Sequence, residues 1–184
     1  MKTLFVNAAF REASRSYRLA KAYLEKYHKE GYETVDLGTV AISPLRQQSL
    51  KVYNEAVAAH DYSDPMFDFG KQFREMDEIV VAAPFWNYHM PAVLHDYFEM
   101  VCSQGITFDI DDKGVYHSLC KAKRMTYITT AGGAIPDDDP AFGYIKVLCD
   151  VFFQIPDTRC IKAERLDVYG TDVEKILSDT IKAM

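Results

Sequence analysis

Short apolar runs alternate with amphipathic helical patterns along the chain, and this alternation restricts the fold more than any other feature. The run EIVVAAP at 78–84 is uninterrupted and contains β-branched residues, which is typical of a strand covered on both faces. The segment 16–30 instead has apolar residues at helical spacing, and Gly31 after it is a good helix terminator. Strand–helix–strand units of this kind are right-handed and build a parallel sheet.

The alternation predicts five strands, at 2–7, 33–37, 78–84, 124–131 and 159–166. Helices are predicted at 16–30, from Pro91 onward, at 140–153 and at 171–184. This count favours an α/β fold: a flavodoxin-like, doubly wound five-stranded parallel sheet in the order 2-1-3-4-5, with helices on both faces. Because the chain has 184 residues and no composition shift that marks a linker, we expect a single domain over 1–184.

Two stretches depart from the simple alternation. Residues 38–66 form a long crossover, with helical character around Gln47–Ala58. Residues 103–117 have alternating apolar positions around Asp112-Lys113-Gly114, which predicts a small hairpin. We expect this hairpin to lie over the carboxyl end of the sheet and to cover the active site.

Charge and cysteine usage narrow the function classes. With 27 acidic and 21 basic residues the net charge is −6, which argues against nucleic-acid or anionic-membrane binding. No apolar run approaches the ~20 residues that span a bilayer. The histidines lack the spacing of a metal site, so no metal is expected. The four cysteines form no CxxC pair and are interpreted as free thiols in a reducing cytoplasm. They are Cys102, Cys120, Cys149 and Cys160.

Ligands of open α/β sheets bind beyond the carboxyl ends of the strands, near the switch in strand order. The loop after the first strand is neither GxGxxG nor a Walker A loop, so it predicts no dinucleotide fingerprint. It does place Ser14, Arg15 and Ser16 at a helix start, where hydroxyls, N–H groups and the helix dipole favour a phosphate. Arg11 adds positive charge. The alternative is a plain serine N-cap.

The loops after the third and fourth strands have the residues for a flat ring. The third contains the only tryptophan, and rings there can stack on a heteroaromatic ligand while an amide meets its polar edge. The fourth contains two glycines that permit close backbone approach. The alternatives are an aromatic core or interface cluster and a turn that needs positive φ. The candidate residues are Pro84, Phe85, Trp86, Asn87, Tyr88, Thr130, Ala131, Gly132 and Gly133. Together with the phosphate site they outline FMN.

These segments resemble a known family. SRSYRL, APFWNYHMPAVLHDYFEMVCSQGITFD and GVYHSLCKAKRMTYITTAGG are similar to the flavodoxin-like FMN-dependent NAD(P)H:quinone oxidoreductases, and most of all to the bacterial FMN-dependent NADH azoreductases. The resemblance covers nearly the whole chain, although 38–66 aligns poorly. It implies a non-covalent FMN, a homodimer with two flavin sites at its interface, and ping-pong hydride transfer from NADH or NADPH to a quinone or azo acceptor.

The resemblance also assigns roles to single residues. Ser14 and Ser16 would hold the FMN phosphate, 84–88 would line the isoalloxazine and ribityl chain, and 130–133 would close around the pyrimidine end. Since the flavin does the chemistry, no catalytic side chain is expected. Phe108 of the hairpin, His89 and Phe153 are candidates for the substrate pocket. Phe153 lies near the position where the family supplies an aromatic residue from the partner subunit, and His89 is alternatively a solvated loop histidine.

The chain departs from the family at Ala8 and Ala9, where a serine or histidine is usual. One phosphate contact is therefore missing, and Arg11 is the candidate replacement. The alternative to an enzyme is a flavodoxin-type FMN-binding electron carrier or a non-catalytic flavin-fold regulator. The moderate acidity of the chain and the predicted hairpin favour the enzyme.

Overall fold

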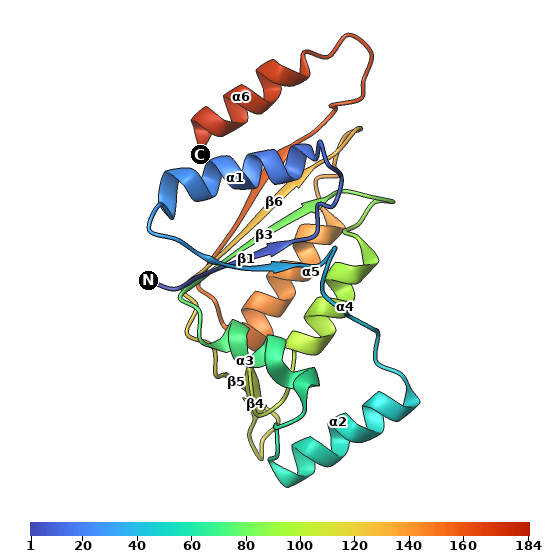
Figure 1. Cartoon of the computed structure of the whole chain (residues 1–184), viewed down its shortest axis with the longest axis vertical. Helices are drawn as coiled ribbons and strands as arrows, with labels where there is room; N and C mark the ends of the chain where they lie inside the picture. The colour runs from blue at the N-terminus through green and yellow to red at the C-terminus, as the bar shows by residue number, and fades with distance from the viewer.

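The computed structural model describes residues 1–184, and a five-stranded parallel sheet lies at its centre (Figure 1). The strands follow the order β2-β1-β3-β6-β7, which confirms the predicted order 2-1-3-4-5. Their bounds are β1 Thr3–Asn7, β2 Glu33–Asp36, β3 Glu78–Pro84, β6 Arg124–Thr130 and β7 Asp157–Ala163. Each lies within three residues of its predicted range.

Helices cover both faces of the sheet, as predicted. On one face lie α1 (Arg15–Tyr27) and α6 (Val173–Ala183), and on the other lie α4 (Ala92–Val101) and α5 (Pro140–Leu148), as Figure 1 shows. Successive residues of β3 point to opposite faces, so Val80 packs with α1 and α6 whereas Val81 packs with α4 and α5. Both residues are fully buried. The continuous apolar run at 78–84 is thereby explained.

The crossover after β2 contains three helical elements. Helix α2 (Gln47–Ala59) agrees with the helical character expected near Gln47–Ala58, but none of its residues is buried. The 3-10 turn η1 (Pro65–Phe67) and helix α3 (Asp68–Arg74) were not predicted from the sequence. The spacing of Phe69 and Phe73 contained the signal for α3, and Phe73 is fully buried in the core. Figure 1 shows α2 at the end of the molecule away from α6.

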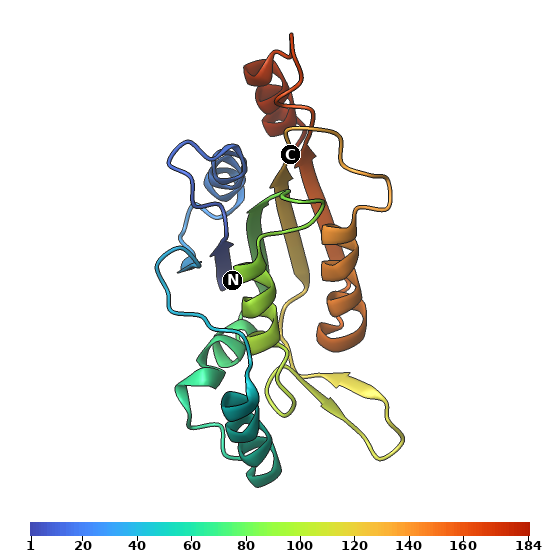
Figure 2. The same cartoon turned by 90° about the vertical axis from the view of Figure 1, so that its right-hand side faces the viewer.

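The predicted hairpin is present, but its expected position is wrong. Strands β4 (Phe108–Ile110) and β5 (Tyr116–Ser118) pair antiparallel. Helix α4 runs back along the sheet and returns the chain to the end at which the parallel strands begin, here called the amino edge. The hairpin therefore projects from the end of the molecule opposite α6 (Figures 1 and 2). The segment after it stays at that edge, where the Lys123 N–H donates to the Asp77 carbonyl, 2.8 Å away, just before β3.

The last part of the helix predicted at 140–153 is a π-helical turn, η2 (Cys149–Phe153). Gln154 follows it with φ of 47° and clamps β5. Its Nε2 donates to the Tyr116 carbonyl at 2.9 Å, and its Oε1 accepts from the Ser118 N–H at 3.3 Å. The end of the α5 segment and the hairpin are thus one packed unit.

All four cysteines are free, which agrees with the sequence, and each is buried or half-buried. Burial raises the pKa of the Cys102, Cys120 and Cys149 thiols to about 12, so these thiols stay protonated at neutral pH. No three histidine, cysteine or carboxylate side chains gather in a way that would hold a metal ion. None of the helices has both the length and the apolar character needed to cross a membrane.

Candidate functional site

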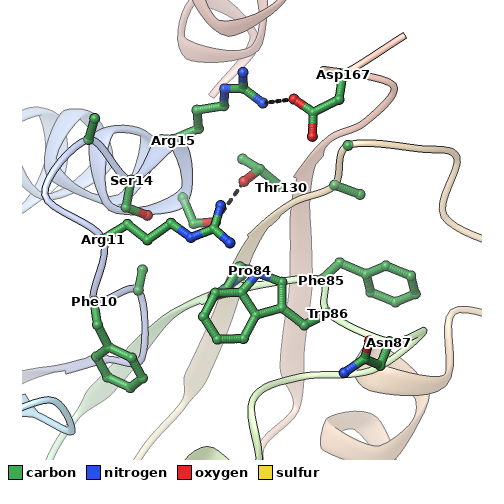
Figure 3. A pocket seen from close by; sticks show the side chains of 15 residues that line it. Phe10, Arg11, Ser14, Arg15, Pro84, Phe85, Trp86, Asn87, Thr130 and Asp167 are labelled. Carbon is green, nitrogen blue, oxygen red and sulfur yellow. Dashed lines mark hydrogen bonds and ion pairs between the residues drawn. The ribbon is translucent and has the colours of Figure 1, made fainter.

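A cavity of about 520 Å³ opens where β1, β3 and β6 end (Figure 3). Its volume is in the range of ligand pockets. The loops after these three strands meet here because parallel pairing aligns their carboxyl ends, with Asn7 opposite Ala82 and Pro84 opposite Thr130. The cavity is lined by every residue predicted to bind the cofactor except Tyr88 and Gly133: Arg11, Ser14, Arg15, Ser16, Pro84, Phe85, Trp86, Asn87, Thr130, Ala131 and Gly132.

The start of α1 forms one end of the cavity. Ser14 is the N-cap, and its hydroxyl accepts a hydrogen bond from the Tyr17 N–H at 3.3 Å. The backbone N–H groups of Arg15 and Ser16 donate to no acceptor in the chain. First-turn N–H groups without partners, together with the helix dipole, favour an anion. The serine cap is therefore present, and the same helix start has two N–H groups that are free to bind an anion.

The side chain of Ser16 joins this helix start to the sheet. Ser16 is fully buried, and its hydroxyl lies 2.7 Å from the Thr130 hydroxyl at the end of β6. The bond holds the first turn of α1 against the centre of the sheet. A phosphate at this helix start would meet the N–H of Ser16, while the hydroxyl keeps the turn in place.

Asp167 lines the cavity although the sequence did not single it out. It lies in the loop after β7, and the Arg15 guanidinium donates to its carboxylate at 2.7 Å (Figure 3). The loop after β7 reaches the site because its backbone bonds to the loop after β6. Asp167 N–H donates to the Gly132 carbonyl at 2.9 Å, and Arg165 N–H donates to the Gly133 carbonyl at 2.8 Å. The other unpredicted lining residues are Ala9, Phe10 and Ala13.

A tight turn after β3 forms the aromatic wall. Trp86 and His89 exchange two backbone hydrogen bonds, with N···O distances of 2.7 and 2.8 Å. Between them Asn87 and Tyr88 have φ of 52° and 62°, the left-handed pair of a type I′ turn. This conformation costs about 1–2 kcal/mol for most residues other than glycine, and asparagine adopts it more readily, so the cost falls mainly on Tyr88. Asn87 lines the cavity, whereas the Tyr88 side chain is 70% exposed and lies outside it.

Arg11 links the first loop to this wall. Its guanidinium carbon lies 5.3 Å from the centre of the Trp86 ring, within the range of a cation–π interaction. Figure 3 shows the arginine beside the indole, between the start of α1 and the aromatic wall. The cavity thus has positive charge next to a flat aromatic surface.

The three predicted substrate-pocket residues do not line this cavity within one chain. Phe108 packs in the hairpin unit, with its ring centre 4.7 Å from that of Phe152. Phe153 is 1% exposed and packs on Phe73 at 4.7 Å. His89 lies at the far end of the Trp86 turn. Phe108 and Phe153 are remote because both belong to the unit at the amino edge of the sheet.

Comparisons with known proteins show the family of the chain and confirm its fold. Residues 1–183 match a protein family described as "Flavodoxin-like fold". The FMN-dependent NADH:quinone oxidoreductase 2 of Clostridium acetobutylicum is 32% identical, over 98% of this chain and 94% of its own. The FMN-dependent NADH:quinone oxidoreductase of Coprothermobacter proteolyticus is also 32% identical, with the same two coverages.

Among solved structures, an FMN-dependent NADH-azoreductase from Bacillus anthracis str. Ames Ancestor, in complex with FMN, superimposes with a TM-score of 0.82. It is 23% identical, and the match covers 99% of this chain and 94% of that one. At this identity the likeness shows the fold.

A Gly132→Ala substitution tests how Asp167 is held. A Cβ on Gly132 would lie 2.2 Å from the Asp167 Oδ2, whereas a Cβ on Gly133 would meet nothing within 4 Å. We expect Gly132→Ala to displace Asp167 from Arg15 and to lower the free energy of unfolding by about 1 kcal/mol, measured in urea, because the carboxylate that must move is exposed. Gly133→Ala should change it by less than about 0.5 kcal/mol.

The double variant Gly132→Ala/Asp167→Ala removes the two shortest contacts and leaves the Asp167 Cβ at 3.2 Å. Because the ion pair with Arg15 is absent from both variants, the double variant should recover only the stability that the steric contact costs. Equal effects of Gly132→Ala and Gly133→Ala would contradict this packing.

Proposed function

The chain belongs to the flavodoxin-like family that it matches over residues 1–183, and from this we propose that it is an FMN-dependent NAD(P)H oxidoreductase acting on quinone or azo acceptors. The observation that carries the proposal is the cavity itself. It combines an anion-binding helix start with a wall containing the only tryptophan of the chain. FMN has a phosphate at one end and a flat ring at the other, and these two ends match the two ends of the cavity.

The residues of the cavity divide between the two ends of the cofactor. The N–H groups of Arg15 and Ser16 and the hydroxyl of Ser14 would hold the phosphate. Ala8 and Ala9 offer no side-chain ligand there, and Arg11 would supply the charge instead. The ring would lie against 84–87 and 130–132, where Gly132 allows the backbone to approach closely.

When bound, FMN would supply the redox chemistry, which is hydride transfer between NADH or NADPH and the acceptor. The chain positions the reactants. Trp86 and Phe85 exclude water from one wall and keep a bound ring flat, while the Arg15–Asp167 ion pair bounds the opposite rim. Donor and acceptor would enter the same cavity in turn, which is the ping-pong order. NADH is the donor in the names of both curated relatives, and the free, protonated thiols suit a reducing cytoplasm.

We further propose that the site is completed in a homodimer. The β4–β5 hairpin projects from the amino end of the sheet and cannot cover the cavity of its own chain (Figure 2). Two apolar residues of the hairpin are exposed, Ile110 at 37% and Val115 at 50%. A projecting hairpin with exposed apolar side chains can reach the cavity of a second copy and bring Ile110, Val115 and the half-buried Tyr116 toward it.

Mixing two defective variants tests this arrangement. One would be Trp86→Ala, and the other Ile110→Ser with Val115→Ser in the hairpin. Each should be impaired alone, because each damages both sites of its own dimer. After unfolding and joint refolding, random pairing should restore about a quarter of wild-type activity, since hybrid dimers have one intact site. Activity no higher than the mean of the two variants, or a monomer in sedimentation, would exclude the shared site.

FMN binding can be followed through Trp86, because its emission is the only tryptophan signal of the chain. We expect FMN to quench this emission in the cofactor-free protein as it binds. Ser14→Ala should weaken binding about 10–100-fold, because a hydrogen bond to a charged group contributes about 1.5–3 kcal/mol.

Asp172→Ala is the matched control. Asp172 caps α6 by accepting from the Lys175 N–H at 3.0 Å and does not line the cavity. Asp172→Ala should lower the free energy of unfolding about as much as Ser14→Ala does, because each removes one helix cap, but it should leave FMN affinity unchanged. The phosphate assignment fails if Ser14→Ala binds FMN like the wild type, or if Asp172→Ala weakens binding equally.

A further inference from the structure

The turn from Trp86 to His89 needs support from outside itself. Asn87 and Tyr88 are both left-handed, and non-glycine residues keep this conformation only where the surroundings hold it. The two backbone hydrogen bonds between Trp86 and His89 close the turn. They do not fix its orientation relative to the sheet, which decides where the Trp86 ring stands in the cavity.

The side chain of His89 supplies an anchor. Its Nδ1 lies 3.0 Å from the Nε2 of His95, which is half-buried on α4. The ring of Tyr144, on α5, lies 4.7 Å from that of His95 and 6.3 Å from that of His89. His89 and His95, the imidazole pair, therefore connect the turn to two helices that pack on the sheet.

We propose that the imidazole pair positions the Trp86 turn for cofactor binding and releases it when both rings become protonated. The inference rests on the proposed function for its cofactor. A hydrogen bond between two imidazole nitrogens needs one nitrogen with a proton and one without. The bond therefore forms when the pair holds no extra proton or one extra proton. With two, N–H faces N–H and two positive charges repel, so the rings must separate.

The groups around the pair set the pH at which this happens. Burial lowers the pKa of His95, and the neighbouring His89 lowers it further. Asp96 and Glu99, also on α4, act in the opposite direction but do not cancel the shift. Tyr144, the group facing the pair from α5, stays neutral because burial raises its pKa. Since the folded state disfavours the second proton, the anchor is complete above about pH 6.5 and weakens as the pH falls below it.

The test compares FMN affinity and Trp86 emission between pH 5 and 8 in four proteins. In the wild type we expect constant affinity above about pH 6.5 and a loss of about 10-fold or more by pH 5. The emission of the cofactor-free protein should shift to longer wavelength over the same range, as Trp86 becomes more exposed to water.

Two substitutions of His95 separate positioning from a general structural role. In His95→Gln the amide can present either N–H or oxygen to His89, so the bond survives both protonation states. The emission shift of the cofactor-free protein should therefore disappear, and FMN affinity should keep only the pH dependence that protonation of the FMN phosphate itself causes, near pH ~6. In His95→Leu the bond is absent at every pH, so affinity should be low throughout. The control is His60→Asn, at the exposed left-handed end of α2, which should follow the wild type.

The proposal is overturned if His95→Gln shows the wild-type pH response, or if His95→Leu matches the wild type in affinity and emission. If the wild type bound no FMN at any pH, the proposed function would fail. The emission titration of the cofactor-free proteins would still decide whether the imidazole pair positions the turn.

Discussion

The hydrogen bonding of β3 between β1 and β6 is the constraint on which the rest of this structure depends. Because β3 is paired on both sides and buried on both faces, its backbone groups are satisfied and its direction is fixed. The carboxyl ends of three neighbouring strands then meet at one edge, and their loops meet with them. The cavity exists because these loops begin at fixed, neighbouring points, and the helix start of α1 faces the wall after β3 across it.

The parts of the fold that follow from local chemistry could be predicted from the sequence. The run at 78–84 marks a buried strand, and the alternation with helices leads to the observed strand order. The position of the hairpin could not be predicted from its own residues. It follows from the direction of α4, whose ten residues return the chain about 15 Å toward the amino edge. Asp167 was missed for a similar reason: backbone bonds between two loops, which leave no sequence pattern, bring it to the site.

The departure from the family at Ala8 and Ala9 has a structural basis. Ala8 is fully buried, and its N–H donates to the Ala82 carbonyl at 2.8 Å, so this position belongs to the core. Ala9 is 4% exposed and its N–H donates to the Asn7 side chain at 3.0 Å. Small residues let the chain pass closely over the end of β1. Under the proposed function Arg11 would supply the charge needed near a phosphate, and its guanidinium also lies over the Trp86 ring. The first loop therefore contacts the aromatic wall through Arg11 and Trp86, and the imidazole pair connects that wall to α4.

The account rests on one central claim, that the cavity holds FMN for hydride transfer from a nicotinamide donor to a small acceptor. Its most direct test is to load the protein with FMN, add NADH without oxygen, and then add a quinone while the visible flavin absorbance is recorded. The account predicts that NADH bleaches the absorbance and that the quinone restores it, with one quinone consumed per NADH. A protein that binds FMN but is bleached by neither NADH nor NADPH would contradict it and indicate an electron carrier or a regulator.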